Sequence, residues 1–431
     1  MKALFKHAHP LALAAALAAA LGGCQERLES GGACPILCPG QQPTIRDTTF
    51  FPVTFDSAVT PFPVQGNEPE LFIASMGDTM ETVAVVRFDS LPTTFRYTST
   101  AEDSSIYAVD SASILLVPAA VDTLGPPLTI EVYTVDLGGP DDTDPDLAAT
   151  AFTPERLIGS RTIPADSARD SVRVMIDNAA VLAVIQPQQQ DVPARGLPLG
   201  IKVNPGSDGQ NHFRLFSAEN PLSSPRLQFR PHFDTAVGFI EGAPRSRVPE
   251  NIFIRIPMAD YLVVVRAPAA APSNVLRVGG IPGSRAYLEF DVPQFLIDST
   301  DIIRATLELT QRPNPDAPQA TDTTTVREEG VVASREVTEL YRRLLFAERF
   351  RERDTLLLVA ADSGLRQFEM IDLVQAWVGT TAERTPRSLA LTSPTEGLMP
   401  RFIDFFSNEA PEAVRPRLRI FYLPRVEGGL P

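Results

Sequence analysis

The sequence has few of the residues on which most catalytic and metal sites depend. Among 431 residues there are three cysteines, four histidines and one tryptophan. Lysine and arginine together number 38 against 53 acids, and neither half of the chain shows in its sequence the strongly basic stretch expected of a nucleic-acid-binding face, so we expect no nucleic-acid partner. Beyond the first 23 residues no run is long and apolar enough to cross a bilayer.

The first 23 residues have the composition of a secretory signal. Lys2 and Lys6 form a basic start, and an Ala/Leu-rich run over residues 11–21 forms the apolar centre. The run ends in Leu-Gly-Gly followed by Cys24, which resembles the bacterial lipobox, where a peptidase cuts before the cysteine that then carries the lipid. We predict a signal peptide at 1–23 and lipidation of Cys24; the alternative is an ordinary secretory signal.

Residues 24–47 are rich in Gly, Pro, Gln and polar residues and are predicted to form a flexible tether. Cys34 and Cys38 are candidates for a small disulfide, because a secreted protein folds in an oxidising compartment. A metal site or two unpaired thiols are the alternatives, although two cysteines without a nearby His are too few for closed zinc coordination. We predict no cofactor.

The segment that contains Cys24 also predicts the location of the protein. Gln25 follows the lipid cysteine, and by analogy with sorting in diderm bacteria the absence of Asp there favours the outer membrane or cell surface. Removal of the signal changes the formal charge from −15 to 36 bases against 53 acids, or −17. This acidity suits a soluble body held outside the cell membrane.

The chain repeats itself. Phe216-Ser-Ala-Glu219 and Phe406-Ser-Asn-Glu409 lie about 190 residues apart, and each is followed by a Pro-Arg-Leu block, at 225–227 and 416–418. A repeat at this distance predicts a tandem duplication. We expect one domain over 48–236 and a second over 237–425.

Both halves consist of short runs rich in Val, Ile, Phe and Tyr, separated by Pro, Gly, Asp and Ser. This pattern is typical of antiparallel strands in a β-sandwich. Nothing in the first half keeps a helical period for three turns, whereas residues 337–353 and 370–378 of the second half are predicted helices, with Trp377 buried. The expected strands are 50–55, 71–74, 83–89, 113–117, 128–133, 171–176, 261–265, 275–278, 286–291 and 304–309.

Several of these blocks together resemble the DNRLRE-type domains, also classed as carbohydrate-binding module family 96. They are Tyr287-Leu-Glu-Phe-Asp291, Ala305-Thr-Leu-Glu-Leu309, Ile371-Asp-Leu-Val-Gln-Ala-Trp377, Phe406-Ser-Asn-Glu409 and Pro416-Arg-Leu-Arg-Ile420. The resemblance covers about residues 274–424, and more weakly 70–235. It implies a jelly-roll-like β-sandwich in a secreted bacterial protein, found beside polysaccharide-degrading enzymes or in surface proteins. The first copy has Val184 or a neighbour in place of the Trp.

The repeated Ser and Glu also suggest a nucleophile, Ser217 or Ser407, with the Glu as base or orienter. Acyl transfer normally needs a base such as His. Beyond the leader the chain has only His212 and His232, whose aligned positions in the second copy are Phe402 and Leu423, which excludes a duplicated triad. We instead predict that each Ser closes a turn and that Glu219 and Glu409 pair with arginines such as Arg226 and Arg417; we assign no catalytic residue.

An acidic loop and a few tyrosines are further candidates for ligand sites. Asp141, Asp142, Asp144 and Asp146 have oxygen-rich spacing for Ca²⁺, but their prolines and the missing EF-hand glycine and glutamate favour a solvated loop. Sugar binding uses exposed aromatic faces, and Tyr97, Tyr107 and Tyr341 are the aromatics nominated as exposed.

The sequence thus predicts a non-catalytic, lipid-anchored envelope protein that acts as a binding or structural module. Its expected partners are the membrane, through the lipid, and a polysaccharide or an envelope protein. An accessory polysaccharide-binding lipoprotein is the alternative, and a secreted hydrolase is the third candidate.

Overall fold

The computed structural model describes most of residues 44–425 and is built mainly of antiparallel strands, as the all-β prediction requires. The residues outside the description are 1–43, 63–65, 67, 90, 97–102, 120–126, 138–145, 147–149, 165–170, 190–195, 207–208, 234–237, 245–258, 315–328, 335–352, 376, 378–386 and 426–431. The predicted helix at 337–353 therefore lies almost wholly outside the described residues.

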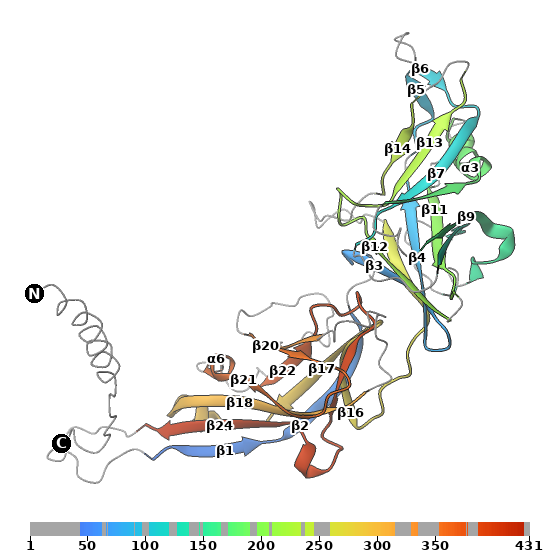
Figure 1. The fold of residues 1–431 in the computed structure, drawn as a ribbon. Helices are drawn as coiled ribbons and strands as arrows, with labels where there is room; N and C mark the ends of the chain where they lie inside the picture. Colours follow the sequence, from blue (N-terminus) through green and yellow to red (C-terminus); the bar gives the residue numbers. More distant parts are fainter. Residues whose placement is uncertain are drawn as a thin grey trace, which may run out of the picture. The chain divides into compact units, whose positions relative to one another are not determined.

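The first sandwich has two principal sheets (Figure 1). One has the order β12–β3–β4–β11–β8–β9, with β15 also paired to β4, and the other has the order β10–β7–β13–β14. Both contribute to one buried core, to which the β5–β6 hairpin adds Phe95 and Ile106. The strands are β3 (Glu70–Met76), β4 (Met80–Phe88), β5 (Thr94–Arg96), β6 (Asp103–Ser105), β7 (Val109–Leu116), β8 (Leu128–Thr134), β9 (Leu157–Ile163), β10 (Val172–Ile176), β11 (Leu197–Val203), β12 (Gln210–Phe216), β13 (Arg226–Pro231), β14 (Ile240–Gly242) and β15 (Asp260–Arg266).

The second sandwich is one curled sheet of 11 strands with its own core. Its main path is β1–β24–β18–β23–β16–β17–β22–β19–β20, with β2 paired to β17 and β21 to β18. Leu307, Phe368 and Phe405 are fully buried in this core. The strands are β1 (Arg46–Phe50), β2 (Pro52–Phe62), β16 (Val275–Gly279), β17 (Gly283–Phe290), β18 (Thr300–Arg312), β19 (Glu329–Ser334), β20 (Arg353–Leu358), β21 (Gly364–Glu369), β22 (Ser388–Thr392), β23 (Phe402–Phe406) and β24 (Arg417–Pro424).

The two sandwiches share their strand pairing residue by residue. Leu227 lies opposite Ile114 in the first, and Leu418 lies opposite Leu307 in the second. Strand β7 lies between β10 and β13, as β18 lies between β21 and β24. The aligned blocks Leu199-Gly-Ile201 and Leu389-Ala-Leu391 likewise lie opposite equivalent residues, Val86 to Ala84 and Leu288 to Ala286.

Strand pairing crosses the boundaries predicted at 48, 236 and 237. Strands β1 and β2, drawn in blue, pair with β24 and β17 of the second sandwich (Figure 1). Strand β15, expected to open the second domain, pairs with β4 of the first. The pair β1–β2 occupies in the second sandwich the positions that β14 and β15 occupy in the first. The N-terminal strands thus close the second sandwich, and the strands between the repeats close the first.

Short helices contribute side chains to both cores. The predicted helix at 370–378 is present as α6 (Ile371–Gln375), and Trp377 is buried as expected. The prediction that the first half has no helix is wrong, because α3 spans Asn178–Gln188 and begins with a bond from the Ala179 amide to Asp177. Its sequence is apolar around most of its circumference and so lacks a helical period. Other short helices are α4 (Gln294–Asp298) and the 3₁₀ turns η1 (Pro154–Arg156) and η2 (Glu412–Val414). Among the described residues no helix is long and apolar enough to cross a membrane.

Candidate functional site

The repeated Ser and Glu form a closed turn at the end of β12. Ser217 is fully buried, and its hydroxyl donates to Glu219 Oε2 over 3.0 Å while accepting from the Glu219 amide over 3.2 Å. The Asn220 amide donates to the Ser217 carbonyl over 3.1 Å. Both atoms of the serine hydroxyl group are therefore engaged within the turn.

The second copy has the same arrangement after β23. The Ser407 hydroxyl donates to Glu409 and accepts from the Glu409 amide over 3.3 Å. The predicted pairing of these glutamates with Arg226 and Arg417 is wrong. The arginines pair with acids of neighbouring strands instead: Arg226 lies 3.4 Å from Glu241, and Arg417 lies 2.5 Å from Glu308, which is opposite it in the register.

A buried carboxyl lies beneath the first turn. Asp260, at the start of β15, is 1% exposed, and the Ala218 amide donates to its Oδ2 over 2.7 Å. Burial raises the pKa of Asp260 well above its usual range, and the nearby charges of Glu219 and Glu68 raise it further. A carboxyl of this kind resembles a general acid in its titration, but a group so buried cannot reach a substrate, and its hydrogen bond joins β15 to the turn.

The two histidines lie in different environments, one buried and one exposed. His212 is buried on β12, and its ring stacks on Phe72 at 5.2 Å between centroids. His232 is exposed, and its Nδ1 lies 2.7 Å from Asp110 Oδ1. Neither is the acceptor of the Ser217 hydroxyl, which donates to Glu219. In the described part of the chain no group of three His, Cys, Asp or Glu side chains is arranged to hold a metal ion.

Of the other candidate ligand-binding residues, Tyr107 and Asp146 lie among the described residues. Tyr107 is 73% exposed, as predicted, and the carbonyl of its neighbour Ala108 accepts from the amide of His232, the residue before Phe233. Phe233 in turn meets Phe95 edge-on at 5.5 Å. Asp146 is exposed. Tyr97, Tyr341, Cys24, Cys34, Cys38, Asp141, Asp142 and Asp144 lie outside the described residues.

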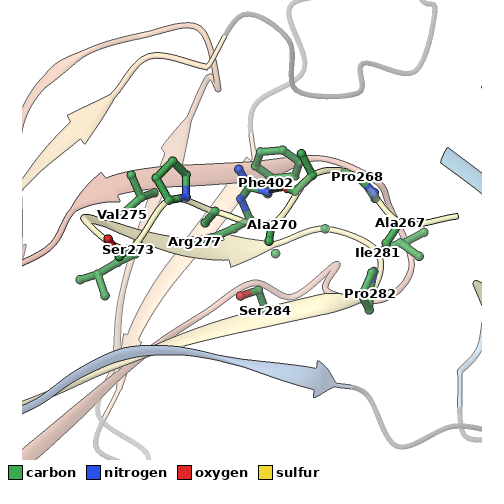
Figure 2. Close-up of a pocket in the computed structure, with 16 residues that line it drawn as sticks. Ala267, Pro268, Ala270, Ser273, Val275, Arg277, Ile281, Pro282, Ser284 and Phe402 are labelled. Carbon is green, nitrogen blue, oxygen red and sulfur yellow. Dashed lines mark hydrogen bonds between the residues drawn. The ribbon is translucent and has the colours of Figure 1, made fainter. Parts of the chain in front are cut away.

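A cavity of about 420 Å³ lies along the β16–β17 hairpin. Figure 2 shows its lining: residues 267–273 and Phe402 on one side, and Pro282 and Ser284 on the other. The hairpin turns at Gly279 and Gly280, with φ of 87° and 88°, where a side chain would be strained. The cavity has the volume of a site for a small organic ligand.

The cavity's one charged residue is already neutralised. Arg277 forms a two-pronged ion pair with Asp404 at 2.9 and 3.1 Å and donates to the Ala269 carbonyl over 2.8 Å. Its guanidinium also lies over the Phe402 ring, 3.7 Å from the centroid. These contacts hold the 267–273 segment against the sheet and leave the remaining wall of Ala, Pro and Ile side chains suited to a neutral ligand.

Sequence reasoning missed Asp260, Arg277 and Asp404. Each pairs with a residue more than 40 positions away in the chain. Such partners leave no local spacing pattern, so only the strand register reveals them.

Comparison with known proteins adds no function. No family model and no curated protein matches the chain. Among solved structures, one of infectious bursal disease virus Gt strain covers 92% of this chain and 81% of its own at 10% identity, with a TM-score of 0.11. A VP2 subviral particle of infectious bursal disease virus covers 91% and 79% at 9% identity, with a TM-score of 0.13. TM-scores this low carry no argument about fold or function.

Proposed function

We propose that the protein is a lipid-anchored, non-catalytic envelope protein whose β-sandwich body serves as a binding or structural module. The observation that carries the proposal is the Leu-Gly-Gly-Cys24 sequence directly after a basic start and an apolar run. A lipid-modified cysteine with two or more acyl chains supplies the affinity that stable anchoring needs. Gln25 favours the outer membrane or cell surface as the location of the protein.

The non-catalytic part of the proposal is supported by the geometry of the repeated turns. In both copies the serine hydroxyl donates to the glutamate two residues later. A nucleophile needs its proton taken by a base in an accessible site, and Ser217 and Ser407 are both buried. The serine and glutamate close the turn after a strand in both copies. This structural role accounts for their repetition without a catalytic reaction.

An accessory polysaccharide-binding lipoprotein is the second candidate, favoured by one observation. Tyr107 is 73% exposed, and the carbonyl of its neighbour Ala108 accepts from the amide of His232, whose ring pairs with Asp110 and adds polar groups. A pyranose ring stacks on aromatic faces beside such groups. Loss of glycan-array binding on Tyr107→Ala would support this candidate, and absence of any glycan binding by the unaltered protein would remove it.

The anchor is tested by Cys24→Ala, with Cys34→Ala as the matched control. The Cys24→Ala chain should leave the membrane fraction for the soluble fraction, because no acyl chain is attached. The Cys34→Ala chain should stay with the membrane. Continued membrane association of Cys24→Ala in carbonate-washed fractions would refute lipidation at this residue.

A further inference from the structure

The outward side of the β10–β7–β13–β14 sheet is the feature that carries a further inference. Alternate residues of its strands point to the core: Ala112, Ile114 and Leu116 on β7 are buried, as are their neighbours on β10 and β13. The intervening residues form the opposite side, because side chains alternate along a strand. This side, called the cationic face below, consists of Ser111, Ser113, Leu115, Arg173, Met175, Arg226, Gln228, Arg230, Phe239 and Glu241. Ser113 and Gln228 within it are buried.

The second sandwich has an equivalent face, on which every arginine has an acid. Arg304 pairs with Glu369, Arg417 with Glu308 and Arg419 with Asp47. Three bases and three acids give this face a formal charge of zero. The charges of the first face can therefore be compared with those at equivalent positions of this neutral face.

The first face lacks these acids at the same positions in the register. Its strands supply Arg173, Arg226 and Arg230 but only Glu241, a formal charge of +2, and the exposed Asp177 that follows β10 accepts from the Ala179 amide. Where the second face has Glu308 and Glu369, the first has Leu115 and Met175. The second face has Asp47 opposite Phe421, whereas in the first Phe239, the residue before β14, lies against Arg230. Apolar residues have taken the places of the neutralising acids, in a chain whose overall charge is −15.

Two arginines of the cationic face are held on an aromatic ring. The guanidinium carbon of Arg230 lies 4.4 Å from the centroid of the Phe239 ring, and that of Arg173 lies 5.6 Å from it. Such contacts orient a guanidinium without neutralising it. The Nε of Arg230 is buried and has no hydrogen-bond partner among the residues described.

Exposed apolar side chains surround these charges. Met175 is 54% exposed, Phe239 is 45% exposed, and Leu222, whose carbonyl accepts from Arg226, is 85% exposed. Exposed apolar groups interspersed with arginines are typical of surfaces that lie in the interface of a lipid bilayer, where the apolar groups enter the headgroup region and the cations meet phosphate.

We propose that the cationic face docks on the anionic phospholipid surface to which the chain is tethered. The inference rests on the proposed lipid anchor, which keeps the body at high local concentration beside the membrane and lets a weak contact matter. Charge complementarity selects this face, because the excess of acids elsewhere repels an anionic surface. The apolar residues favour a lipid surface over a soluble polyanion, which would need only the arginines.

The test uses the full chain carrying Cys24→Ala, so that binding does not depend on the lipid. Vesicles containing phosphatidylglycerol, and vesicles of phosphatidylcholine alone, are sedimented with the protein at low ionic strength. Adding Arg173→Gln and Arg230→Gln should lower the partition coefficient on the anionic vesicles about 30-fold, since each basic residue near the surface contributes about fivefold. The matched control, Arg304→Gln with Arg419→Gln, makes the same change in net charge and should bind as the parent does.

A second variant guards against misfolding. Met175→Glu supplies the acid that the second face has at this position and should weaken binding about fivefold while retaining the parental circular dichroism spectrum. Equal losses in the test and control variants, equal binding to both kinds of vesicle, or no binding by the parent would overturn the proposal. Binding to soluble acidic polysaccharide without binding to anionic vesicles would also overturn it. The anchor is judged separately, from lipidation of the unaltered chain, so either proposal can fail alone.

Discussion

The repeated serines offer the sharpest test of the structural interpretation, through Ser217→Ala and Ser407→Ala. Each substitution removes a hydroxyl that donates to a glutamate carboxylate and accepts from the same residue's amide. Both serines are at most 1% exposed, so water cannot readily replace the lost bonds. The turn at the end of β12 or β23 loses the contacts that close it.

The cost follows from the group left unpaired. A typical hydrogen bond contributes about 1 kcal/mol, and a buried donor without a partner costs about 1–3 kcal/mol. Because the glutamate side chains are partly accessible to water, only the amide is fully penalised. We therefore expect each substitution to lower the free energy of unfolding by about 1–3 kcal/mol.

Urea denaturation measures both effects. Trp377 is the single tryptophan and lies in the second core, so its fluorescence reports the second sandwich and detects Ser407→Ala. Circular dichroism follows the whole chain and detects Ser217→Ala. Ser160, exposed on β9, provides the control, and its change to Ala should alter stability by less than about 0.5 kcal/mol.

The reasoning would be refuted by unchanged unfolding midpoints for Ser217→Ala and Ser407→Ala. It would equally be refuted if either variant abolished hydrolysis of an ester or glycoside substrate while keeping its stability. That result would show that the serine takes part in catalysis and would favour the hypothesis of a secreted hydrolase.

Three other changes test specific contacts. The pKa of the Asp260 carboxyl is raised in the native state, so the parent protein is most stable below the unfolded pKa of about 4 and loses stability as the pH rises toward the folded pKa. Asp260→Asn has no such carboxyl, so its stability relative to the parent should increase as the pH rises above about 4. Thermal unfolding of both proteins across pH 4–8 measures this difference. Gly159→Ala should destabilise by about 1–3 kcal/mol in urea titrations, because its Cβ would lie 2.2 Å from the Met175 carbonyl oxygen. Trp377→Ala should cost about 3–5 kcal/mol by loss of a side chain that is 1% exposed, measured by circular dichroism.

Each of these three predictions can be contradicted by a specific result. For Asp260→Asn, a stability difference from the parent that stays constant between pH 4 and pH 8 would show that the carboxyl does not titrate differently on folding. Unchanged stability of Gly159→Ala would contradict the close approach of β9 to β10. A Trp377→Ala loss below 1 kcal/mol would contradict its place in the second core.

The repeat blocks predicted much of the fold because they fall on core strands. Leu227 and Leu418, which belong to the matching Pro-Arg-Leu blocks, lie opposite the equivalent residues Ile114 and Leu307. A period of two residues with buried Val, Ile and Leu is a local signal, and it survives in both copies.

The exchanged strands could not be predicted in the same way. Strand β2 pairs with β17, more than 200 residues later in the chain, and nothing in its own sequence names that partner. Tyr261 to Val265 was correctly predicted as a strand but assigned to the wrong sandwich, because propensity reports a strand and not its neighbour. The ion pairs of the two outward faces depend on this register and were hidden for the same reason.

The lipid anchor is tested most directly by the mass of the N-terminal peptide of the protein purified from membranes. We predict a peptide that begins at Cys24 and carries a thioether-linked diacylglycerol and an amide-linked acyl chain. A peptide that begins elsewhere, or an unmodified Cys24, would contradict the proposed function.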